Sequence, residues 1–581
     1  MAMNVREWTR EHFMANQLDC KQLLENSDAL QEIPCLNSLS LDYFKEGQLV
    51  KFRGMIQDIF NPEYYYENYE VKDTNTGASS IRSGMFMDLT QCSPQEQLSL
   101  NSPNNKHSER QPFFVISVPG LNDWANRKSS LIDISTAVKN VNKRSHETTE
   151  EELMDCSEPT KKKEKTSDSC DSAMESSKSN QSTSGIVSME HILNFPIPNQ
   201  DGKACIVKVY ENDEIHKLND VIDIIGFLSL DPAQCVSDNG DESMDDMEVQ
   251  THNPPVSMVP RLHAIKVVPL KENIISRDPV IMSKAELIRS DLQMFLSKLL
   301  FDDTLAADYL ICHLISSIYM RKDFLCLGSF PINITKFPLE KYKDFSKELY
   351  GVLTQLIPKS HFVELTLENL NDMSFTPKKD YQCNRLTSGV LQLSNNTHLV
   401  IDETHLTLGQ VTPCGRKNYD TLNKLVQYQK ISYDFQFYMV DYETDIPVLI
   451  LSETKSFIPC PTQVPLKVDD ETVNVYPQVL EAAKQYLKDE TRLENIRQYL
   501  NILRHGNFEF NDQMTKIIQE DFVKMRQVNK SFTGDNLHTL MVFARLMALS
   551  YGKNTLTSDI WKKTFEFEVE RIGRIPKRNE H

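Results

Sequence analysis

Between residues 284 and 460, apolar runs of strand type alternate with helical patterns along the chain. KAELIRSDLQMFLSKLL and LAADYLICHLISSIYM have apolar spacings of three and four, so each predicts a helix. The strand candidates FLCLGSFPINI, FVELTLENL, NTHLVIDET and IPVLILSE alternate with helices through KDFSKELYGVLTQLI and TLNKLVQYQKI. This alternation is typical of a three-layer α/β domain with a largely parallel sheet.

The last stretch, residues 461–581, has helical patterns only. They run through ENIRQYLNILR, DQMTKIIQEDFVKMRQ, NLHTLMVFARLMALSYG and SDIWKKTFEFEVERI. We therefore expect a helical lid or bundle after the α/β domain.

The sequence before residue 284 predicts a half with a different architecture. Residues 1–35 have helical periodicity, carried by Trp8, Phe13, Leu18, Leu23, Leu24 and Leu30. From Leu49, LVKFRGMIQDIF alternates apolar and polar residues around a glycine, as a curved strand with a bulge does. RQPFFVISVPG, KACIVKVYE, DVIDIIGFLSLD and VPRLHAIKVVPL predict further strands. Short strands with glycine breaks favour a small β-barrel of the OB type, in two parts at 1–137 and 191–275, although a small β-sandwich has a similar pattern.

Two polar segments interrupt this half. Residues 138–190 are rich in serine and lysine and contain too few apolar residues to offset chain entropy, so we expect a disordered insertion. Residues 236–256 carry six acids between Asp238 and Glu248 and include two consecutive prolines. This composition predicts a solvated acidic loop.

The insertion contains two basic clusters. Lys143 and Arg144 come first, and Lys161, Lys162, Lys163 and Lys165 follow after sixteen residues. Such clusters are candidates for a nuclear import signal, although the spacer is longer than in the usual bipartite form and solvated charge is the alternative. Nearby serines and threonines could be phosphorylated, which would change this charge.

Charge and cysteine usage narrow the class of protein. The formal net charge of -19 over 581 residues opposes strong non-specific binding to DNA. Twelve cysteines are scattered without a C-x-x-C pair, and no histidine pair has metal-ligand spacing, so we expect reduced intracellular thiols and no metal site. The polar start of the chain and the lack of an apolar run of eighteen residues predict a protein that is neither secreted nor membrane-spanning.

One short motif suggests nucleotide chemistry. Leu399, Val400 and Ile401 lead into Asp402 and Glu403, the pattern of a Walker B strand, in which the first acid holds magnesium and the second polarises the attacking water. The same pattern also arises often by chance. An ATPase further needs the phosphate-binding loop G-x-x-x-x-G-K-[ST], which this chain lacks. LGSFPINITKFP, with Gly328 and a lone Lys336, stands where that loop is expected, so we predict no nucleotide cofactor and no catalytic residue.

These segments resemble a known group of proteins. NRLTSGVLQLSNNTHLVIDETHL resembles the Walker B region of minichromosome maintenance (MCM) helicase subunits, and FTGDNLHTLMVFARLMALSYGKNTLTSDIW resembles their helical lid, with Arg545 near the position of the sensor arginine. The chain as a whole is similar to the family of MCM complex-binding proteins, relatives of those subunits that have lost the ATPase apparatus. The similar segments include LVKFRGMIQDIFNPEYY, LNSPNN, ACIVKVYE, DTLAADYLICHLISSIYMRKD, KDYQCNRLTSGVLQL and LVIDET.

The resemblance implies an α/β multidomain, MCM-like protein. Its halves would be a helical and OB-like half and a degenerate AAA+-like half with a helical lid. It also implies a nuclear, chromatin-associated factor that binds helicase subunits in place of one of them, affects assembly or unloading of the complex during replication, and supports sister-chromatid cohesion. Two alternatives remain open on the residues alone. An active AAA+ ATPase would use Asp402 and Glu403, and an OB-type single-stranded DNA-binding protein would need basic or aromatic groove residues.

Overall fold

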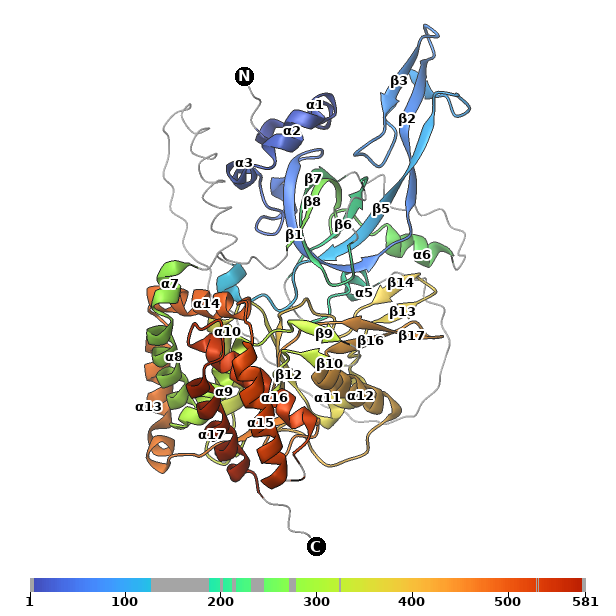
Figure 1. Ribbon diagram of the computed structural model, residues 1–581. Helices are drawn as coiled ribbons and strands as arrows, with labels where there is room; N and C mark the ends of the chain where they lie inside the picture. The colour runs from blue at the N-terminus through green and yellow to red at the C-terminus, as the bar shows by residue number, and fades with distance from the viewer. Residues whose placement is uncertain are drawn as a thin grey trace, which may run out of the picture.

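The chain folds into two halves of different architecture (Figure 1). The computed structural model describes residues 5–126, 188–198, 202–211, 216–230, 245–270, 278–322, 325–528, 530 and 532–576. Strands dominate the N-terminal half, and helices surround a parallel sheet in the C-terminal half. The predicted mixed α/β, multidomain class is confirmed. Residues 138–187 of the predicted insertion, with the basic residues Lys143, Arg144, 161–163 and Lys165, lie outside the described residues. The prediction of disorder was wrong for the end of the insertion, because α5 (Met189–Leu193) begins there.

Short helices open the N-terminal half: α1 (Arg10–Ala15), α2 (Gln17–Leu23) and α3 (Ser27–Glu32), with 3-10 turns at Val5–Glu7 and Leu41–Tyr43. Thr9 caps α1 by accepting a hydrogen bond from the His12 amide at 3.2 Å. Phe13 is buried and packs edge-on against Phe227, with ring centroids 6.0 Å apart. Leu18 was predicted on the same apolar face but is 80% exposed, because the helix breaks at Asn16 and the periodicity does not continue across the break.

Five strands of this half close into a ring. They are β1 (Leu49–Ile59), β5 (Lys106–Ile116), β6 (Ala204–Val209), β7 (Val221–Ser229) and β8 (Arg261–Pro269). The pairing order is β1-β7-β8-β6-β5, and β5 pairs back onto β1. Only the β6–β8 pair is parallel. The predicted bulge in β1 is confirmed between Ile56 and Asp58. Gly226 lies at a register shift of β7 where an added Cβ would stand 2.3 Å from the His263 carbonyl oxygen, so no side chain fits there.

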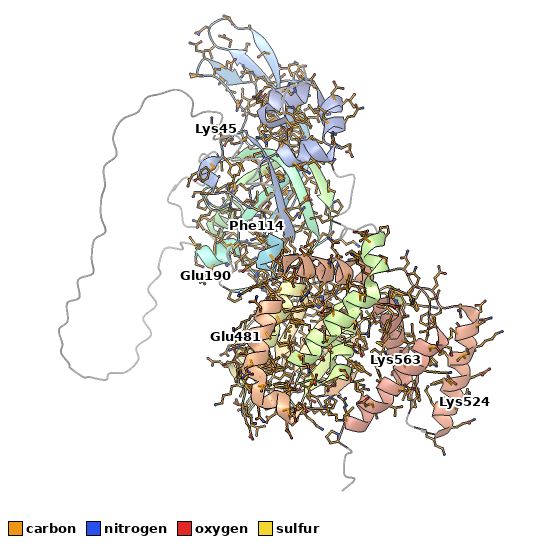
Figure 2. The ribbon with its side chains drawn as sticks, turned by 90° about the vertical axis from the view of Figure 1, so that its left-hand side faces the viewer. Lys45, Phe114, Glu190, Glu481, Lys524 and Lys563 are labelled. Atoms are coloured by element: carbon orange, nitrogen blue, oxygen red, sulfur yellow. The ribbon has the colours of Figure 1, made fainter. Side chains whose placement is uncertain are left out.

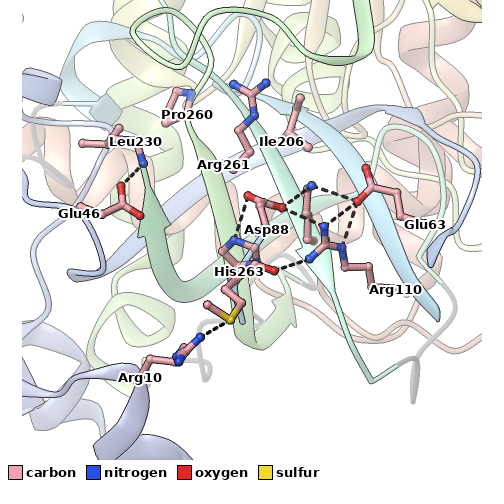
Figure 3. A network of polar contacts seen from close by, with 12 residues as sticks. Arg10, Glu46, Glu63, Asp88, Arg110, Ile206, Leu230, Pro260, Arg261 and His263 are labelled. Carbon is pink, nitrogen blue, oxygen red and sulfur yellow. Dashed lines mark hydrogen bonds and ion pairs between the residues drawn. The ribbon is translucent and has the colours of Figure 1, made fainter. Parts of the chain in front are cut away.

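An arm of three strands that the sequence analysis did not predict extends from β5. It consists of β2 (Glu63–Asp73), β3 (Ser79–Ser83) and β4 (Glu96–Leu98). A buried ionic network fixes the base of the arm (Figure 3). Asp88 accepts hydrogen bonds from Arg110 at 2.9 Å and Lys208 at 2.6 Å, and its Oδ2 lies 3.2 Å from Nε2 of His263. Burial opposes ionisation of Asp88, but His263, Lys208 and Arg110 hold its pKa well below the ordinary value.

Two helices lie near the boundary between the halves: α5 (Met189–Leu193) and α6 (Asp245–His252). The prediction of a loop at 236–256 was wrong for residues 245–252, which form α6. Contacts distant in sequence hold this helix: the His252 ring packs 4.2 Å from the Phe60 ring, and its Nε2 lies 3.1 Å from the Cys383 carbonyl oxygen. The acidic composition of residues 236–256 gives no indication of these contacts, so it did not predict the helix.

The C-terminal half is built on a parallel sheet of β11 (Ile332–Thr335), β12 (Ser360–Glu364), β15 (His398–Asp402), β18 (Val448–Leu451) and β19 (Thr462–Pro465). The spatial order is β12-β15-β18-β11-β19. Alternate residues of β15 enter two different cores, Leu399 and Ile401 on one face and Val400 on the other. Burial on both faces explains why this strand is a continuous apolar run.

Helices cover both faces of this sheet: α7 (Pro279–Ser283), α8 (Ala285–Leu299), α9 (Thr304–Leu314), α10 (Phe345–Leu356), α11 (Leu367–Asp372) and α12 (Pro413–Tyr428). Three predicted boundaries were wrong. The second predicted helix ends at Leu314, FLCLGSFPINI forms two strands separated by Gly328, and the end of FVELTLENL is helix α11. Thr366 caps α11 by accepting from the Asn369 amide at 3.0 Å, so the strand stops there.

Two small sheets flank the parallel sheet. One pairs β9 (Met320–Lys322) with β10 (Leu325–Leu327). The other has the order β14-β13-β16-β17, from β13 (Lys378–Asp380), β14 (Arg385–Thr387), β16 (Lys430–Asp434) and β17 (Met439–Glu443).

The predicted C-terminal helices are α14 (Glu490–Arg504), α15 (Asp512–Val528), α16 (Gly534–Ser550) and α17 (Ser558–Arg574), with α13 (Asp470–Tyr486) preceding them. They pack against the α/β half: α13, α14 and α16 contact α8, and α17 contacts α16 and β19 (Figure 2). Buried residues of α13, α14 and α16 share one hydrophobic core with α8, α9 and the sheet. These helices therefore belong to the packing of the α/β half.

Residues far apart in sequence join the two halves. Asn194, after α5, donates to the Leu386 carbonyl and accepts from the Ser388 amide, each at 2.8 Å. Gln392 donates to the Gln57 carbonyl at 2.9 Å. On another side, the Trp124 indole donates to the Thr354 carbonyl at 2.9 Å. Since two of these four bonds are buried and two are partly buried, we expect the halves to behave as one unit.

Candidate functional site

The carboxyl end of β15 carries the acidic pair that the sequence analysis selected. Asp402 ends the strand in register with Glu364 of β12 and Leu451 of β18. It is 1% exposed, and its Oδ1 accepts a hydrogen bond from the Thr404 amide at 3.0 Å. The position is that of a ligand-binding carboxylate at the edge of a parallel sheet, but the side chain faces its own turn.

Glu403 is bound by the loop that follows β18. Its carboxylate accepts hydrogen bonds from the Ser456 hydroxyl at 2.9 Å, the Phe457 amide at 2.9 Å and the Ile458 amide at 3.3 Å. Burial raises the pKa of this carboxyl, and the hydrogen bonds from the loop oppose the rise. A carboxylate occupied by three donors of its own chain is poorly placed to polarise a water molecule. In this structure, Glu403 connects β15 to the loop at 456–458.

The connection from β11 to α10 stands where a phosphate-binding loop would lie. Residues 336–344 contain no glycine, although phosphate binding through backbone amides depends on glycines. Lys336 has a left-handed φ of 63°, and its Nζ donates to the Arg574 carbonyl at 3.1 Å. Asp344, a negatively charged residue, occupies the N-cap of α10, where an incoming phosphate would approach.

Gly328, the other residue singled out near this position, lies before β11 and has a packing role. Its φ is +106°, and an added Cβ would stand 2.2 Å from the Ser317 carbonyl oxygen. The glycine is therefore required for the close approach between the segment after α9 and the β10–β11 turn.

Arg545, the candidate sensor arginine, lies on α16 and packs on aromatic rings. Its guanidinium carbon is 4.4 Å from the centroid of Tyr319 and 5.9 Å from that of Phe508. Burial lowers its pKa, and Nη1 has no hydrogen-bond partner. Across the described part of the chain, no contact joins Arg545 to Asp402 or Glu403. The two neighbouring acids thus lie at the end of β15, and Arg545 lies apart from them, between aromatic rings.

Among the residues that the structure describes, no cluster of three or more histidine, cysteine or acidic side chains could hold a metal ion. Likewise, none of the helices so described is long and apolar enough to cross a membrane.

The contact between Asp58 and the segment around Leu386 was not predicted from the sequence. Asp58 is buried, and its Oδ2 accepts from the Leu386 amide at 2.8 Å. Burial raises the pKa of Asp58. An acid inside the apolar run of β1 was a signal that some partner had to satisfy it, but nothing local identified that partner.

Fold and site define a mixed α/β multidomain protein whose acidic pair, at the end of a parallel strand, accepts hydrogen bonds from its own chain. The family described as mini-chromosome maintenance replisome factor matches residues 20–575. A mini-chromosome maintenance complex-binding protein of Drosophila melanogaster is 36% identical over 587 residues, which cover 98% of this chain and 96% of that protein. Proteins of the same name from Danio rerio and Homo sapiens are 36% and 35% identical, cover 95% and 96% of this chain, and are themselves covered to 92% and 93%. The chain belongs to this family of MCM complex-binding proteins.

Proposed function

We propose that this chain is a non-catalytic, nuclear binding partner of the MCM replicative helicase subunits. It takes the position of one subunit in a hetero-oligomer and affects assembly or unloading of the complex during DNA replication. Chromatin association and support of sister-chromatid cohesion follow from that role. The family membership and the names of the relatives support the partner, and the site supports the absence of catalysis.

Strand order supports descent from helicase-type subunits. Numbered along the chain, the parallel sheet has the order 5-1-4-3-2, which is typical of AAA+ ATPases, and Asp402 ends its third strand, as a Walker B acid does. The closed ring of the N-terminal half has the order 1-2-3-5-4 with strands 3 and 5 parallel, which is typical of an OB barrel. We therefore interpret the chain as an OB-like half joined to a degenerate AAA+-like half.

The observation that carries the non-catalytic part is the state of Glu403. All three of its hydrogen-bond donors come from residues 456–458 of the same chain. Lys336 in turn donates to the Arg574 carbonyl, and the loop around it has no glycine. Neither the water-polarising group nor the phosphate-binding loop of an ATPase is available, so Asp402, Glu403 and Arg545 are interpreted as vestiges. Subunits contact one another through large lateral faces, and these contacts do not require ATP hydrolysis. A protein that has lost catalysis can therefore still bind the subunits.

Co-purification tests the proposal. The full-length chain is mixed with the helicase subunits of its own species, and the complex is examined by native and crosslinking mass spectrometry. We expect one copy of the chain in an assembly that lacks one helicase subunit. Glu403→Gln is the control and should assemble equally well. Recovery of no helicase subunit would overturn the proposal.

Nuclear import is tested separately. Replacement of Lys161, Lys162, Lys163 and Lys165 by alanine should shift a fluorescent fusion from the nucleus to the cytoplasm, because import receptors bind basic clusters. The Lys143→Ala, Arg144→Ala variant tests whether the first cluster contributes. If both variants stay nuclear, these residues are not the import signal.

A further inference from the structure

Strand β17 is an edge strand, and among the described residues no backbone hydrogen bond engages its outer side. It pairs with β16 in a ladder that places Met439 opposite Asp434 and Glu443 opposite Lys430. The Thr444 amide donates to the Gln429 carbonyl, and the Phe435 amide donates to the Tyr438 carbonyl. Because hydrogen-bonded pairs alternate in an antiparallel ladder, residues 438, 440, 442 and 444 direct their backbone groups toward β16. Residues 439, 441 and 443 therefore direct theirs away from the sheet.

A groove of about 880 Å³ borders this strand. Residues 441–445 form one wall, and residues 217–220 with Asp58, from the N-terminal half, form another. Two side-chain oxygens of lining residues, Asn219 Oδ1 and Thr444 Oγ1, are buried and have no hydrogen-bond partner.

Acidic side chains predominate along the groove. Asp58, Asp220, Asp441, Glu443 and Asp445 line it, against Lys217, Arg321 and Lys379. Asp441 already binds Lys424 at 2.6 Å and Ser432 at 2.7 Å, and Asp58 is buried, so Glu443 is the acid best placed for a new partner. The ion pairs of Glu443 are long, 3.7 Å to Arg321 and 4.0 Å to Lys430. A lysine or arginine of an incoming segment would find an acidic partner there, whereas a nucleic-acid strand would be repelled.

Exposed aromatic side chains lie at the other end of β17. Phe437 is 83% exposed and Tyr438 is 58% exposed at the tip of the β16–β17 hairpin, and Met439 follows them. The Phe437 ring lies 5.6 Å from the ring of Tyr381. Aromatic and methionine side chains exposed together are typical anchors of protein–protein interfaces.

We propose that β17 and its groove bind an extended segment of a helicase subunit, which adds as a further strand to this sheet. This inference rests on the proposed function and names the surface that carries it. The main chain of the segment pairs with residues 439, 441 and 443. A basic side chain faces the acidic groove, and an apolar one packs on Phe437 and Tyr438.

Hydrogen exchange and two kinds of variant test this surface in the full-length chain. In complex with purified helicase subunits of the same species, amides 439, 441 and 443 should exchange more slowly than in the free chain. Asp441→Pro removes one outward N–H, which an edge strand tolerates, and should weaken binding about tenfold. Asp441→Asn keeps that N–H and should bind within about threefold of the wild type. The Phe437→Ala, Tyr438→Ala variant, at exposed positions, should also weaken binding and does not depend on a proline being accommodated.

The outcomes separate this inference from the proposed function. A complex that forms without protection of β17 and is unaffected by Asp441→Pro and by the aromatic variant overturns the groove and leaves the proposed function standing. Failure of the wild-type chain to bind any subunit overturns both. Protection of β17 by an oligothymidylate probe with no subunit present would show that the occupant is nucleic acid, which also overturns the inference.

Discussion

The Oδ2 atom of Asp58 accepts a hydrogen bond from the backbone amide of Leu386 at 2.8 Å, between residues 328 positions apart in the chain. Leu386 belongs to NRLTSGVLQL, one of the segments that carries the resemblance to the family. In space this segment is the joint between the barrel half and the α/β half. One of the segments that carries the resemblance to the family therefore has an architectural role, because it joins the two halves, in addition to its place before β15.

We expect Asp58→Ala to destabilise the protein by about 2–4 kcal/mol, because the buried amide of Leu386 and the partly buried amide of Ile59 both lose their acceptor. Asp223→Ala is the control. It removes a half-exposed ion pair with Arg53 and should cost about 0.5 kcal/mol. Urea denaturation measures both. Equal losses for the two variants would show that the contact between the halves contributes little.

Glu403→Gln should lower stability by about 1–2 kcal/mol, because an amide group replaces an acceptor of three hydrogen bonds. It should not trap nucleotide. Glu453→Ala, an exposed acid of the same loop, should change stability little. The measurements are thermal unfolding and retention of labelled ATP. Trapping of nucleotide by the glutamine variant would support the alternative of an active ATPase.

Two buried histidines should make the fold sensitive to mild acid. Burial lowers the pKa of His313 to about 4 and holds that of His398 well below its usual range, with Arg504 adding to both effects. Below pH 6.5 the unfolded chain binds protons that the folded chain does not. The stability present above that pH is therefore lost as the pH falls toward the folded pKa, by about 1.4 kcal/mol per pH unit for each histidine.

The variants His313→Asn and His398→Gln test this dependence. Asparagine can replace the donor to the Phe330 carbonyl, and glutamine can replace the acceptor facing Arg504. Urea denaturation between about pH 7.5 and pH 5.5 should give a shallower dependence for the double variant than for the wild type. An unchanged dependence would mean that these histidines do not control it.

Single-stranded DNA should bind weakly. The segment FNPEYYYENYE contains aromatic residues that could stack on DNA bases, but two of them, Tyr65 and Tyr69, are buried in the arm. The acid Glu109 lies opposite the exposed Tyr64 in the β2–β5 ladder, and the whole chain carries a net charge of -19. Fluorescence anisotropy with an oligothymidylate should show little binding even at low salt. Tight binding with a steep salt dependence, lost in Tyr64→Ala, would favour the DNA-binding alternative.

Local patterns predicted much of the fold. Alternation located β1 and the apolar runs of β5 to β8, and helical spacing located α8, α10, α12 and α14 to α17. The arm at 63–98 was missed because EYYYENYE lacks simple alternation and its packing depends on Asp88 and Arg110. Contacts between residues far apart in sequence determine the remaining features of the fold, such as the pairing of β5 with β1 and the packing of α6.

The candidate site shows the same limit. The sequence placed Asp402 and Glu403 at the end of a buried strand, because an apolar run followed by acids is a local signal. The hydrogen bonds of Glu403 come from residues 456–458, more than fifty positions later. The side chains around Arg545 are Tyr319 and Phe508, which are also distant in sequence. No local pattern reports such partners.

Titration calorimetry of the purified full-length chain with magnesium and ATP tests the central claim, that an ATPase-like architecture persists without its nucleotide function. With Glu403 engaged by its own chain and no glycine loop after β11, we expect no saturable binding at millimolar ATP. Tight, magnesium-dependent binding that is lost on replacement of Asp402 by asparagine would contradict the account.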